Sequence, residues 1–539
     1  MDFSRGQLPR ATTATEKTPV IAAEIRPVVA WRWSPAAWFQ AEGRWVLLVL
    51  LATLVAAAVR AAALTGKALV FDETFSVFLA RQPLDRLWAL VAANDPHPPL
   101  YYILLHYWVV SFGDSEVAVR AFSVAAGAAT VLITGLFGRR LVGPLPALLG
   151  AWFLALAPAH VAASQEARMY GLLAAMGTAS WWALYEAVRS GRGRLWVVYG
   201  LLTALMWYTH YFGFLIWIAQ GIYVGWTCRS RPIEVGKWIL AGSGALLLLL
   251  PWVPSLLEQI AAGRGWPVYR PAFHWSTVLE TLWGMTAGGP IAAAEGLGGW
   301  TIGPVEPDAA VLVAAAAVVI LLAAAVRRNH ARGWPVGLLL LAAVVPVLLA
   351  GAISMRLNVF SPRYVVFVVP PIALLLATGV ARVSEIRTRW APWVAAGLVG
   401  AVLVPNALAL GDFYRRPRMD DFDWRMLAQT VSRRARSDDA MVFLPGFSLI
   451  PVDYYFRGPQ LRMALTPNGT EVIGPGGIGM REVGAALKPH PRVWILIVPP
   501  IPPAADGLLR MLQRDAFKVT GQGRVHRTYL ILMERVAAR

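Results

Sequence analysis

The chain has 539 residues, of which 57% are hydrophobic and 15% are charged. Soluble domains carry about 25% charged residues, and the mean hydropathy of this chain is +0.54. These values exclude an ordinary soluble protein and predict a polytopic α-helical membrane protein. The net charge of +18 does not indicate nucleic-acid binding, because the basic residues gather in loops between apolar segments and a basic surface also attracts anionic lipids.

The N-terminal residues are polar, basic and contain prolines. They lack the short apolar core and the small-residue cleavage site of a secretory signal. We therefore expect a cytoplasmic basic tail over residues 1–44. Cys228 is the only cysteine, which excludes an intramolecular disulfide and a cysteine-based metal site.

Eleven apolar segments approach the roughly 20 residues that a helix needs to cross about 30 Å of hydrocarbon. They are Trp45–Leu64, Val117–Phe137, Leu145–Ala163, Tyr170–Ala187, Leu195–Thr209, Phe212–Thr227, Trp238–Val253, Ala309–Val326, Pro335–Ile353, Tyr364–Val380 and Ala391–Leu410. We predict a transmembrane domain over residues 45–411.

The orientation follows from the distribution of positive charge. Basic loops such as Arg139-Arg140 and Arg327-Arg328 all fall on one side if the apolar segment Leu100–Phe112 does not cross the membrane. Because Lys and Arg favour cytoplasmic loops, we expect this segment to be a juxtamembrane or partly inserted helix. The N-terminus then lies in the cytoplasm, and Asp72 lies outside.

The composition changes after about Leu410. Residues 412–539 alternate between polar and apolar runs, which predicts a small extracytoplasmic α/β domain. The expected strands are Ala440–Leu444, Val493–Val498 and Tyr529–Met533, and the expected helices are Trp424–Ala435 and Ala505–Arg514.

Two carboxylates follow the first predicted span. Asp72 and Glu73 lie beside hydrocarbon, where ionisable groups are costly and usually functional. A carboxylate there can take the proton of an acceptor hydroxyl, so both residues are candidates for catalysis. The structural alternative is a pair of acids that caps the helix Thr74–Ala80.

The run Asp95-Pro96-His97-Pro98-Pro99 precedes an aromatic helix. Asp95 is a candidate catalytic residue, and the imidazole of His97 is suited to contact a phosphate or a metal ion. The alternative is a rigid turn with a helix cap.

Outward arginines form a third group. Arg168 lies in the predicted outer loop Ser164–Tyr170, and a planar guanidinium is suited to bind a phosphate. Arg356 and Arg363 precede a later span and are candidate partners of Arg168. Snorkelling of arginine to the interface is the structural alternative.

Aromatic residues accompany these cations. Tyr170, His210 and Tyr364 are candidates to line the same substrate cavity, although a histidine among aromatic residues is more often structural. The outer loop Ser255–Asp308 contains several aromatic residues that suit an acceptor-side lid or an interfacial anchor. The acidic run Asp420-Asp421-Phe422-Asp423 is similar to a metal motif of nucleotide-sugar enzymes but is better explained as a helix cap.

Together these motifs resemble a known family. Phe71-Asp72-Glu73, the run from Asp95 to Tyr102, Gly113–Glu116 with Arg120, Gly138–Leu141, Ser164–Tyr170 and Pro362–Tyr364 resemble the bacterial members of the protein mannosyltransferase and aminoarabinose transferase superfamily. These enzymes are glycosyltransferases of the GT-C fold, also called family 39-like. The resemblance covers about residues 45–385.

The resemblance implies an inverting transfer from a polyprenyl-phosphate sugar at the outer face of the bacterial inner membrane. It implies that Asp72 is the base, that Asp95 organises the acceptor or an ion, and that Arg168 binds the donor phosphate. Use of a divalent metal varies in the family, and Asp72, Asp95 and His97 offer oxygen and nitrogen ligands for one. No long outer insert is present, which weakens a protein acceptor and leaves lipid and polysaccharide acceptors open.

Two other functions remain open from the sequence. A transporter or flippase of a lipid-linked sugar would need charged residues near the middle of the membrane, and most spans lack them. A noncatalytic assembly subunit that kept the fold is the other alternative.

Overall fold

The computed structural model describes residues 43–261, 272–288, 291–292, 301–302, 309–327, 334–415, 422–465, 477–499 and 501–536. The chain separates into two compact units, Met1–Val46 and Leu47–Arg539. The predicted tail over residues 1–44 lies almost wholly outside the described residues. The description below concerns the second unit, together with residues 43–46, where its first helix begins.

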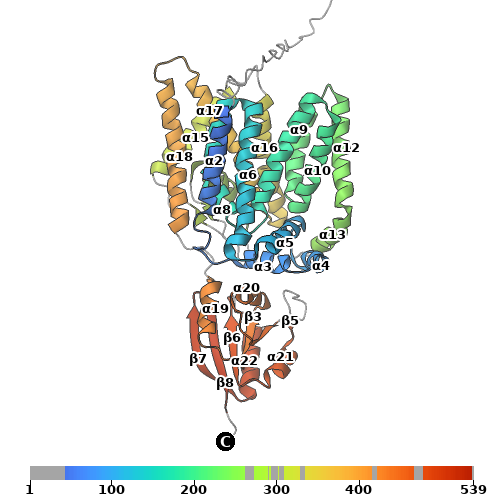
Figure 1. Ribbon diagram of the computed structural model, residues 1–539, viewed down its shortest axis with the longest axis vertical. Coiled ribbons are helices and arrows are strands. Elements are labelled where there is room, and N and C mark those ends of the chain that lie inside the picture. The colour runs from blue at the N-terminus through green and yellow to red at the C-terminus, as the bar shows by residue number, and fades with distance from the viewer. Residues whose placement is uncertain are drawn as a thin grey trace, which may run out of the picture. The chain divides into compact units, whose positions relative to one another are not determined.

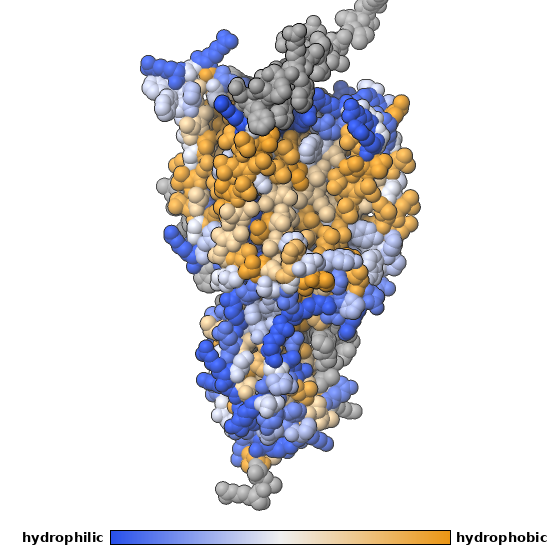
Figure 2. Space-filling model, in the orientation of Figure 1, coloured by the Kyte–Doolittle hydropathy of each residue, from blue (hydrophilic) through white to orange (hydrophobic). Residues whose placement is uncertain are grey.

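Each of the eleven predicted spans coincides with helical structure. The helices are α2 (Arg44–Ala61), α6 (Glu116–Val142), α7 (Pro144–Ala155), α8 (Pro158–Ser164), α9 (Tyr170–Ser190), α10 (Gly193–Thr209), α11 (Gly213–Thr227), α12 (Pro232–Leu249), α15 (Ala309–Arg327), α16 (Trp334–Leu357), the 3-10 helix η3 (Pro362–Val368) with α17 (Val369–Ser384), and α18 (Ala391–Arg415). Figure 2 shows the apolar surface that these helices expose.

Six of the described helices are long and apolar enough to cross a membrane by themselves. A seventh span results if α7 and α8, which meet at 60°, are counted together. The prediction of a multi-pass helical membrane protein is therefore confirmed. The number of eleven spans stays a prediction, because α10 has 17 residues and α11 has 15, fewer than the roughly 20 that cross a bilayer directly.

Three short helices follow α2. They are α3 (Phe71–Ala80), α4 (Leu84–Asn94) and α5 (Leu100–Phe112), and Figure 1 shows them at one end of the long helices. The 13 residues of α5 extend over about 20 Å, less than the hydrocarbon core. This length agrees with the predicted juxtamembrane helix. Further short elements are the 3-10 helix η2 (Leu250–Trp252), α13 (Val253–Ala261), α14 (Trp275–Ala287) and the paired strands β1 (Ile291–Ala292) and β2 (Thr301–Ile302).

A buried arginine stabilises the break between α7 and α8. Arg60 is 0% exposed and donates to the carbonyl oxygens of Leu154 and Ala155 at 3.1 and 2.9 Å. These carbonyls end α7, where a cation is favourable. Arg60 also contacts His160 Nδ1 at 2.8 Å. The break therefore directs the chain into the segment that contains Arg168.

A buried ion pair joins three segments of the fold. Glu73 is 0% exposed and accepts two hydrogen bonds from Arg120 on α6, at 2.8 and 2.7 Å. Its two oxygens also accept from the backbone N–H groups of Val70 and Ala167, each at 3.0 Å. Arg120 in turn donates to backbone carbonyls before α3. The start of α3, α6 and the segment after α8 are thus held together.

The C-terminal region forms a separate sheet with helices, as predicted. Its six strands lie in the order β5-β4-β3-β6-β8-β7, with β3, β4, β5 and β6 parallel and β8 antiparallel to both β6 and β7. The strands are β3 (Ala440–Leu444), β4 (Leu461–Leu465), β5 (Gly477–Ile478), β6 (Arg492–Ile497), β7 (Phe517–Val525) and β8 (Thr528–Arg535). The helices are α19 (Trp424–Ser432), the 3-10 helix η4 (Gly446–Ser448), α20 (Leu449–Tyr455), α21 (Met480–Leu487) and α22 (Ala504–Arg514).

Strand β3 is buried at all five residues and β6 at all six, which places them in the centre of the domain. Buried parallel strands form continuous apolar runs, and this is why the sequence predicted them. The edge strand β7 is mostly exposed and polar, and the sequence did not predict it.

The C-terminal domain contacts the segment that leads into α3. The hydroxyl of Tyr455 accepts a hydrogen bond from the backbone N–H of Leu69 at 2.7 Å and donates to Glu116. Arg425 binds the same carboxylate of Glu116. Phe447 packs edge-on against Phe71, with ring centroids 5.1 Å apart. The residue before Asp72 is therefore fixed by the C-terminal domain.

We expect Glu73→Gln to destabilise the protein by about 3–5 kcal/mol, because it leaves the buried guanidinium of Arg120 without its anion. Chemical unfolding of the purified protein in detergent measures the effect. Glu258→Gln is the control, since Glu258 is exposed on α13. Equal stability of the two variants would contradict a structural role for Glu73.

Candidate active site

The centre of the candidate site is a carboxylate–imidazole pair in the loop between α4 and α5. Both Asp95 and His97 are buried, at 5% and 2% exposure. Asp95 Oδ1 lies 2.6 Å from His97 Nδ1 and accepts from the His97 backbone N–H at 2.8 Å. Because a carboxylate only accepts, His97 Nδ1 is the donor to Asp95, and Arg168 Nη2 lies 3.2 Å from the same nitrogen.

The charges of this pair follow from its surroundings. Burial alone raises the pKa of Asp95, but the opposing effects of His97, Arg168 and the Tyr102 hydroxyl hold that pKa well below its usual range. Burial lowers the pKa of His97, and attraction to Asp95 offsets this only in part. The surroundings thus favour the ionised form of Asp95, and the burial of His97 disfavours its charged form.

Arg168 completes this buried network. It is 3% exposed and donates from Nη1 to the hydroxyls of Tyr102 at 2.9 Å and Ser76 at 3.3 Å. The Tyr102 hydroxyl donates to Asp95 Oδ2 at 2.7 Å, and Arg168 Nη1 is 3.6 Å from that oxygen. Among the described residues, Arg168 Nε has no hydrogen-bond partner. A buried donor of this kind suggests an additional ligand.

A second cation holds Asp72. Arg363 in η3 is 2% exposed at its side chain, and its Nη1 lies 3.3 Å from Asp72 Oδ2. The same nitrogen is 3.7 Å from Glu166, which is 1% exposed. The Asp72 side chain keeps 27% exposure. Asp72 is thus the accessible carboxylate of the site, and Arg363 orients it.

Aromatic rings cover one side of these groups. The Tyr364 ring lies 4.8 Å from His210 and 5.6 Å from Tyr170, measured between centroids. His97 and His210 are 5.0 Å apart, and the guanidinium of Arg363 lies 5.6 Å from the Tyr170 ring. The rings therefore connect the Arg363 side of the site to the His97 side.

The structure brings together most of the predicted site residues. The network contains Asp72, Asp95, His97, Arg168, Tyr170, His210, Arg363 and Tyr364. Arg356 is exposed at the end of α16, whereas Arg363 is buried. Both oxygens of Glu73 are committed to Arg120 and to backbone groups, which agrees with the capping alternative rather than with catalysis.

Some site residues were not predicted. Tyr102, Ser76 and Glu166 are all part of the buried network. Tyr102 lies in the same motif as Asp95, and Glu166 lies in the same motif as Arg168. Their nearness in the chain to these two candidates is the signal that could have identified them. The acidic pair Asp420-Asp421 and much of the predicted lid Ser255–Asp308 lie outside the described residues.

The predicted metal ligands do not form a metal site in the described part of the chain. No three His, Cys, Asp or Glu side chains there are arranged to hold a metal ion. Asp95 and His97 Nδ1 bind each other, and Asp72 pairs with Arg363. The set Asp72, Asp95 and His97 therefore does not fit a metal ion in this structure.

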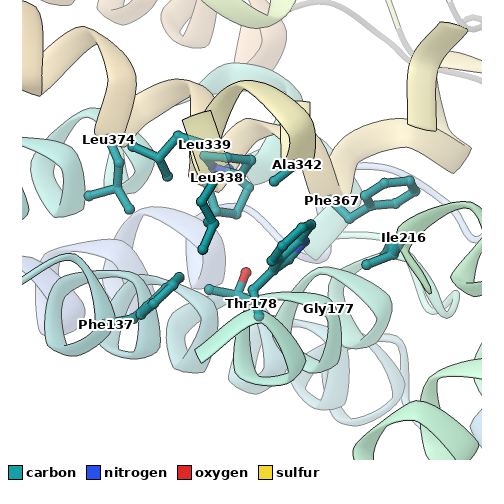
Figure 3. A pocket seen from close by; sticks show the side chains of 12 residues that line it. Phe137, Gly177, Thr178, Ile216, Leu338, Leu339, Ala342, Phe367 and Leu374 are labelled. Carbon is teal, nitrogen blue, oxygen red and sulfur yellow. The ribbon is translucent and has the colours of Figure 1, made fainter. Parts of the chain in front are cut away.

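A small cavity lies elsewhere among the helices. It measures about 20 Å³ and is lined by apolar residues such as Phe137, Ile216 and Leu338, with Thr178 beside them (Figure 3). It contains no titratable side chain. This cavity is therefore a packing gap and not a candidate active site.

Comparison with known proteins gives matches in sequence and in fold. Residues 96–255 match the family described as dolichyl-phosphate-mannose-protein mannosyltransferase. A relative named undecaprenyl phosphate-alpha-4-amino-4-deoxy-L-arabinose arabinosyl transferase, from Pseudomonas aeruginosa (strain UCBPP-PA14), is 31% identical over 160 residues. The match covers 27% of this chain and only 29% of the relative.

The fold is similar to that of ArnT from Cupriavidus metallidurans. The apo structure of that protein matches with a TM-score of 0.59 and 15% identity, over 91% of this chain and 98% of ArnT. Its structure bound to undecaprenyl phosphate matches with a TM-score of 0.58 and 14% identity, over 92% and 99% of the two chains.

These matches include the segment that contains His97, Arg168 and His210. They agree with the resemblance that the motifs indicate. The predicted resemblance is therefore confirmed: the chain is similar to the protein mannosyltransferase and aminoarabinose transferase superfamily, and its fold is that of the GT-C glycosyltransferases.

Proposed function

We propose that this protein transfers a sugar from a polyprenyl-phosphate donor to an extracytoplasmic acceptor, with inversion at the anomeric carbon. The observation that carries the proposal is the convergence of an accessible carboxylate, Asp72, with the buried guanidinium of Arg168, which bonds to Ser76 on the same helix and whose Nε has no hydrogen-bond partner among the described residues. The first is suited to activate a hydroxyl, and the second is suited to bind a phosphate.

The reaction requires one bond to form as another breaks. The acceptor oxygen attacks the anomeric carbon while Asp72 takes the hydroxyl proton. The bond between the anomeric carbon and the phosphate oxygen breaks, and its electron pair leaves with the polyprenyl phosphate. Arg363 orients Asp72 from 3.3 Å away.

Arg168 is suited to stabilise the leaving group. Negative charge develops on the phosphate during the transfer, and a preorganised cation stabilises that charge. Tyr102 and Ser76 fix the guanidinium through hydrogen bonds to Nη1, so little reorganisation is needed. The aromatic faces of Tyr170 and Tyr364 are suited to pack against the sugar.

The proposed location is the bacterial inner membrane, with the N-terminus in the cytoplasm and the site and residues 412–539 outside. The distribution of Arg and Lys in the loops supports this orientation. Polyprenyl phosphate in the outer leaflet could then approach the site laterally, without passing through water.

A lipid-linked-sugar transporter is the second candidate. The feature that favours it is the buried charge of Arg60 within α2, since intramembrane charges often mark transport pathways. However, Arg60 donates to the carbonyl oxygens that end α7. This structural use, together with the charges gathered around Asp72 and Arg168, favours the transferase.

We expect Asp72→Asn to lower turnover by at least about 100-fold, because the amide cannot accept the acceptor's proton. The measurement is release of polyprenyl phosphate from a panel of lipid-phosphate sugars, followed by mass analysis of the product. Asp85→Asn is the control, since Asp85 is exposed on α4. Full turnover by a folded Asp72→Asn protein would exclude Asp72 as the base.

We expect Arg168→Gln to weaken the binding of polyprenyl phosphate by about 10- to 100-fold, as a charge-assisted hydrogen bond is lost. Titration of the purified protein with the lipid phosphate measures the dissociation constant. Arg86→Gln, at an exposed position of α4, should bind normally. A normal dissociation constant for Arg168→Gln would place the phosphate elsewhere.

The orientation is testable by cysteine labelling, because Cys228 is the only cysteine. In a Cys228→Ala background, we expect Asp85→Cys and Arg457→Cys to react with an impermeant maleimide in intact cells. Arg192→Cys should react only after permeabilisation. All three positions are exposed. Labelling of positions 85 and 192 from the same side would refute the proposed topology.

A further inference from the structure

A cleft lies between helix α3 and the C-terminal domain, apart from the network around Asp95. Its volume is about 410 Å³, within the range of sites for small ligands. Its lining includes Phe78, Arg81, Asp453, Tyr454, Gln460 and Arg462. It therefore extends from α3 along α20 to the beginning of β4.

The charges of this cleft neutralise one another. Arg462 Nε lies 2.8 Å from Asp453, whose side chain is 42% exposed. Arg81 pairs with Asp114 at 2.5 Å. Because each cation has its own carboxylate, a strongly anionic or cationic ligand would meet no net opposite charge.

The remaining features of the lining suit a ligand that is neutral and rich in hydroxyl groups. Gln460 Nε2 donates to the Arg436 carbonyl at 3.0 Å and Arg462 Nη1 donates to the Gly458 carbonyl at 2.7 Å. The second N–H of the Gln460 amide, the Nη2 group of Arg462 and the half-exposed Asp453 carboxylate are the groups that a ligand can bind. Phe78 and Tyr454 add aromatic surface, on which sugar rings stack. A hydrocarbon chain would instead remove water from the charged groups without replacing their hydrogen bonds.

The cleft and Asp72 lie on different faces of the same helix. Thr74, Phe78 and Arg81 line the cleft, and their spacing places them on one face of α3. Asp72 and Ser76 lie about half a turn away on the other face. A sugar in the cleft is therefore not the one that reacts, but it can belong to a longer chain whose end reaches Asp72.

We propose that this cleft binds neutral sugar residues of an oligosaccharide acceptor, at a distance from the reacting hydroxyl. The proposal rests on the transferase function proposed above, which gives the bound chain its role as acceptor. It names an acceptor class, a neutral oligosaccharide or polysaccharide, that the site around Asp72 alone does not specify.

The test is direct binding of labelled neutral di- to octasaccharides of mannose, glucose, galactose or arabinose to the full chain in nanodiscs. We expect at least one of these series to bind saturably. Arg462→Gln and Asp453→Asn should each weaken that binding by at least about tenfold, since each removes a charged hydrogen-bonding group. Arg510→Gln, at an exposed position of α22, should leave it unchanged.

The result that overturns the proposal is binding of no neutral oligosaccharide by the wild-type protein, or equal binding by the cleft variants. Asp453→Asn preserves the shape of a partly exposed side chain, so it decides the question if Arg462→Gln does not fold. Release of polyprenyl phosphate is measured separately. Glycan binding without donor turnover would refute the transferase function alone, and turnover without glycan binding would refute the cleft alone.

Discussion

The ion pair between Glu73 and Arg120 is the interaction on which the rest of the site depends. It joins the start of α3 to α6, and through Ala167 it joins both to the segment that contains Arg168. These connections hold Asp72 and Arg168 near each other although they are far apart in the chain. A buried ion pair contributes little net stability against an apolar substitute. The ion pair instead fixes geometry, because its hydrogen bonds can form in only one arrangement of the three segments.

Burial separates the charged groups that position the site from those that a substrate can reach. Glu73 and Arg60 are completely buried, and their hydrogen bonds join elements of the fold. Asp72 is partly exposed, and Arg168 Nε lacks a hydrogen-bond partner within the described part of the chain. The site thus combines charged groups that are fixed by their hydrogen bonds with a few charged groups that a substrate can still bind. Electrostatic catalysis requires such preorganised groups.

The sequence predicted the membrane fold because hydrocarbon imposes a length and an apolar composition on every span. It also predicted the central strands β3 and β6, which are apolar apart from Arg492 at the start of β6. It did not predict β7, whose exposed and polar residues carry no strand pattern, or the short strands β4 and β5. Elements that are stabilised by their neighbours rather than by their own composition give no signal in one sequence.

Within the site, the motifs predicted which segments meet but not how each side chain is used. Asp72 and Glu73 are adjacent, yet successive residues of a helix point about 100° apart. One carboxylate therefore remains accessible beside Arg363, and the other is buried against Arg120. Similarly, Arg356 and Arg363 formed one predicted pair, but only Arg363 reaches the network. Burial and direction are tertiary properties, and they decide between catalytic and structural roles.

The central claim is that Asp72 and Arg168 act on one sugar phosphate, and a structure with a non-transferable polyprenyl-phosphate sugar bound tests it most directly. We expect a phosphate oxygen about 2.7–3.0 Å from the Arg168 guanidinium. We also expect the anomeric carbon to face Asp72, with room for a hydroxyl between them. A phosphate bound away from Arg168, or an anomeric carbon on the far side of α3 from Asp72, would contradict the account.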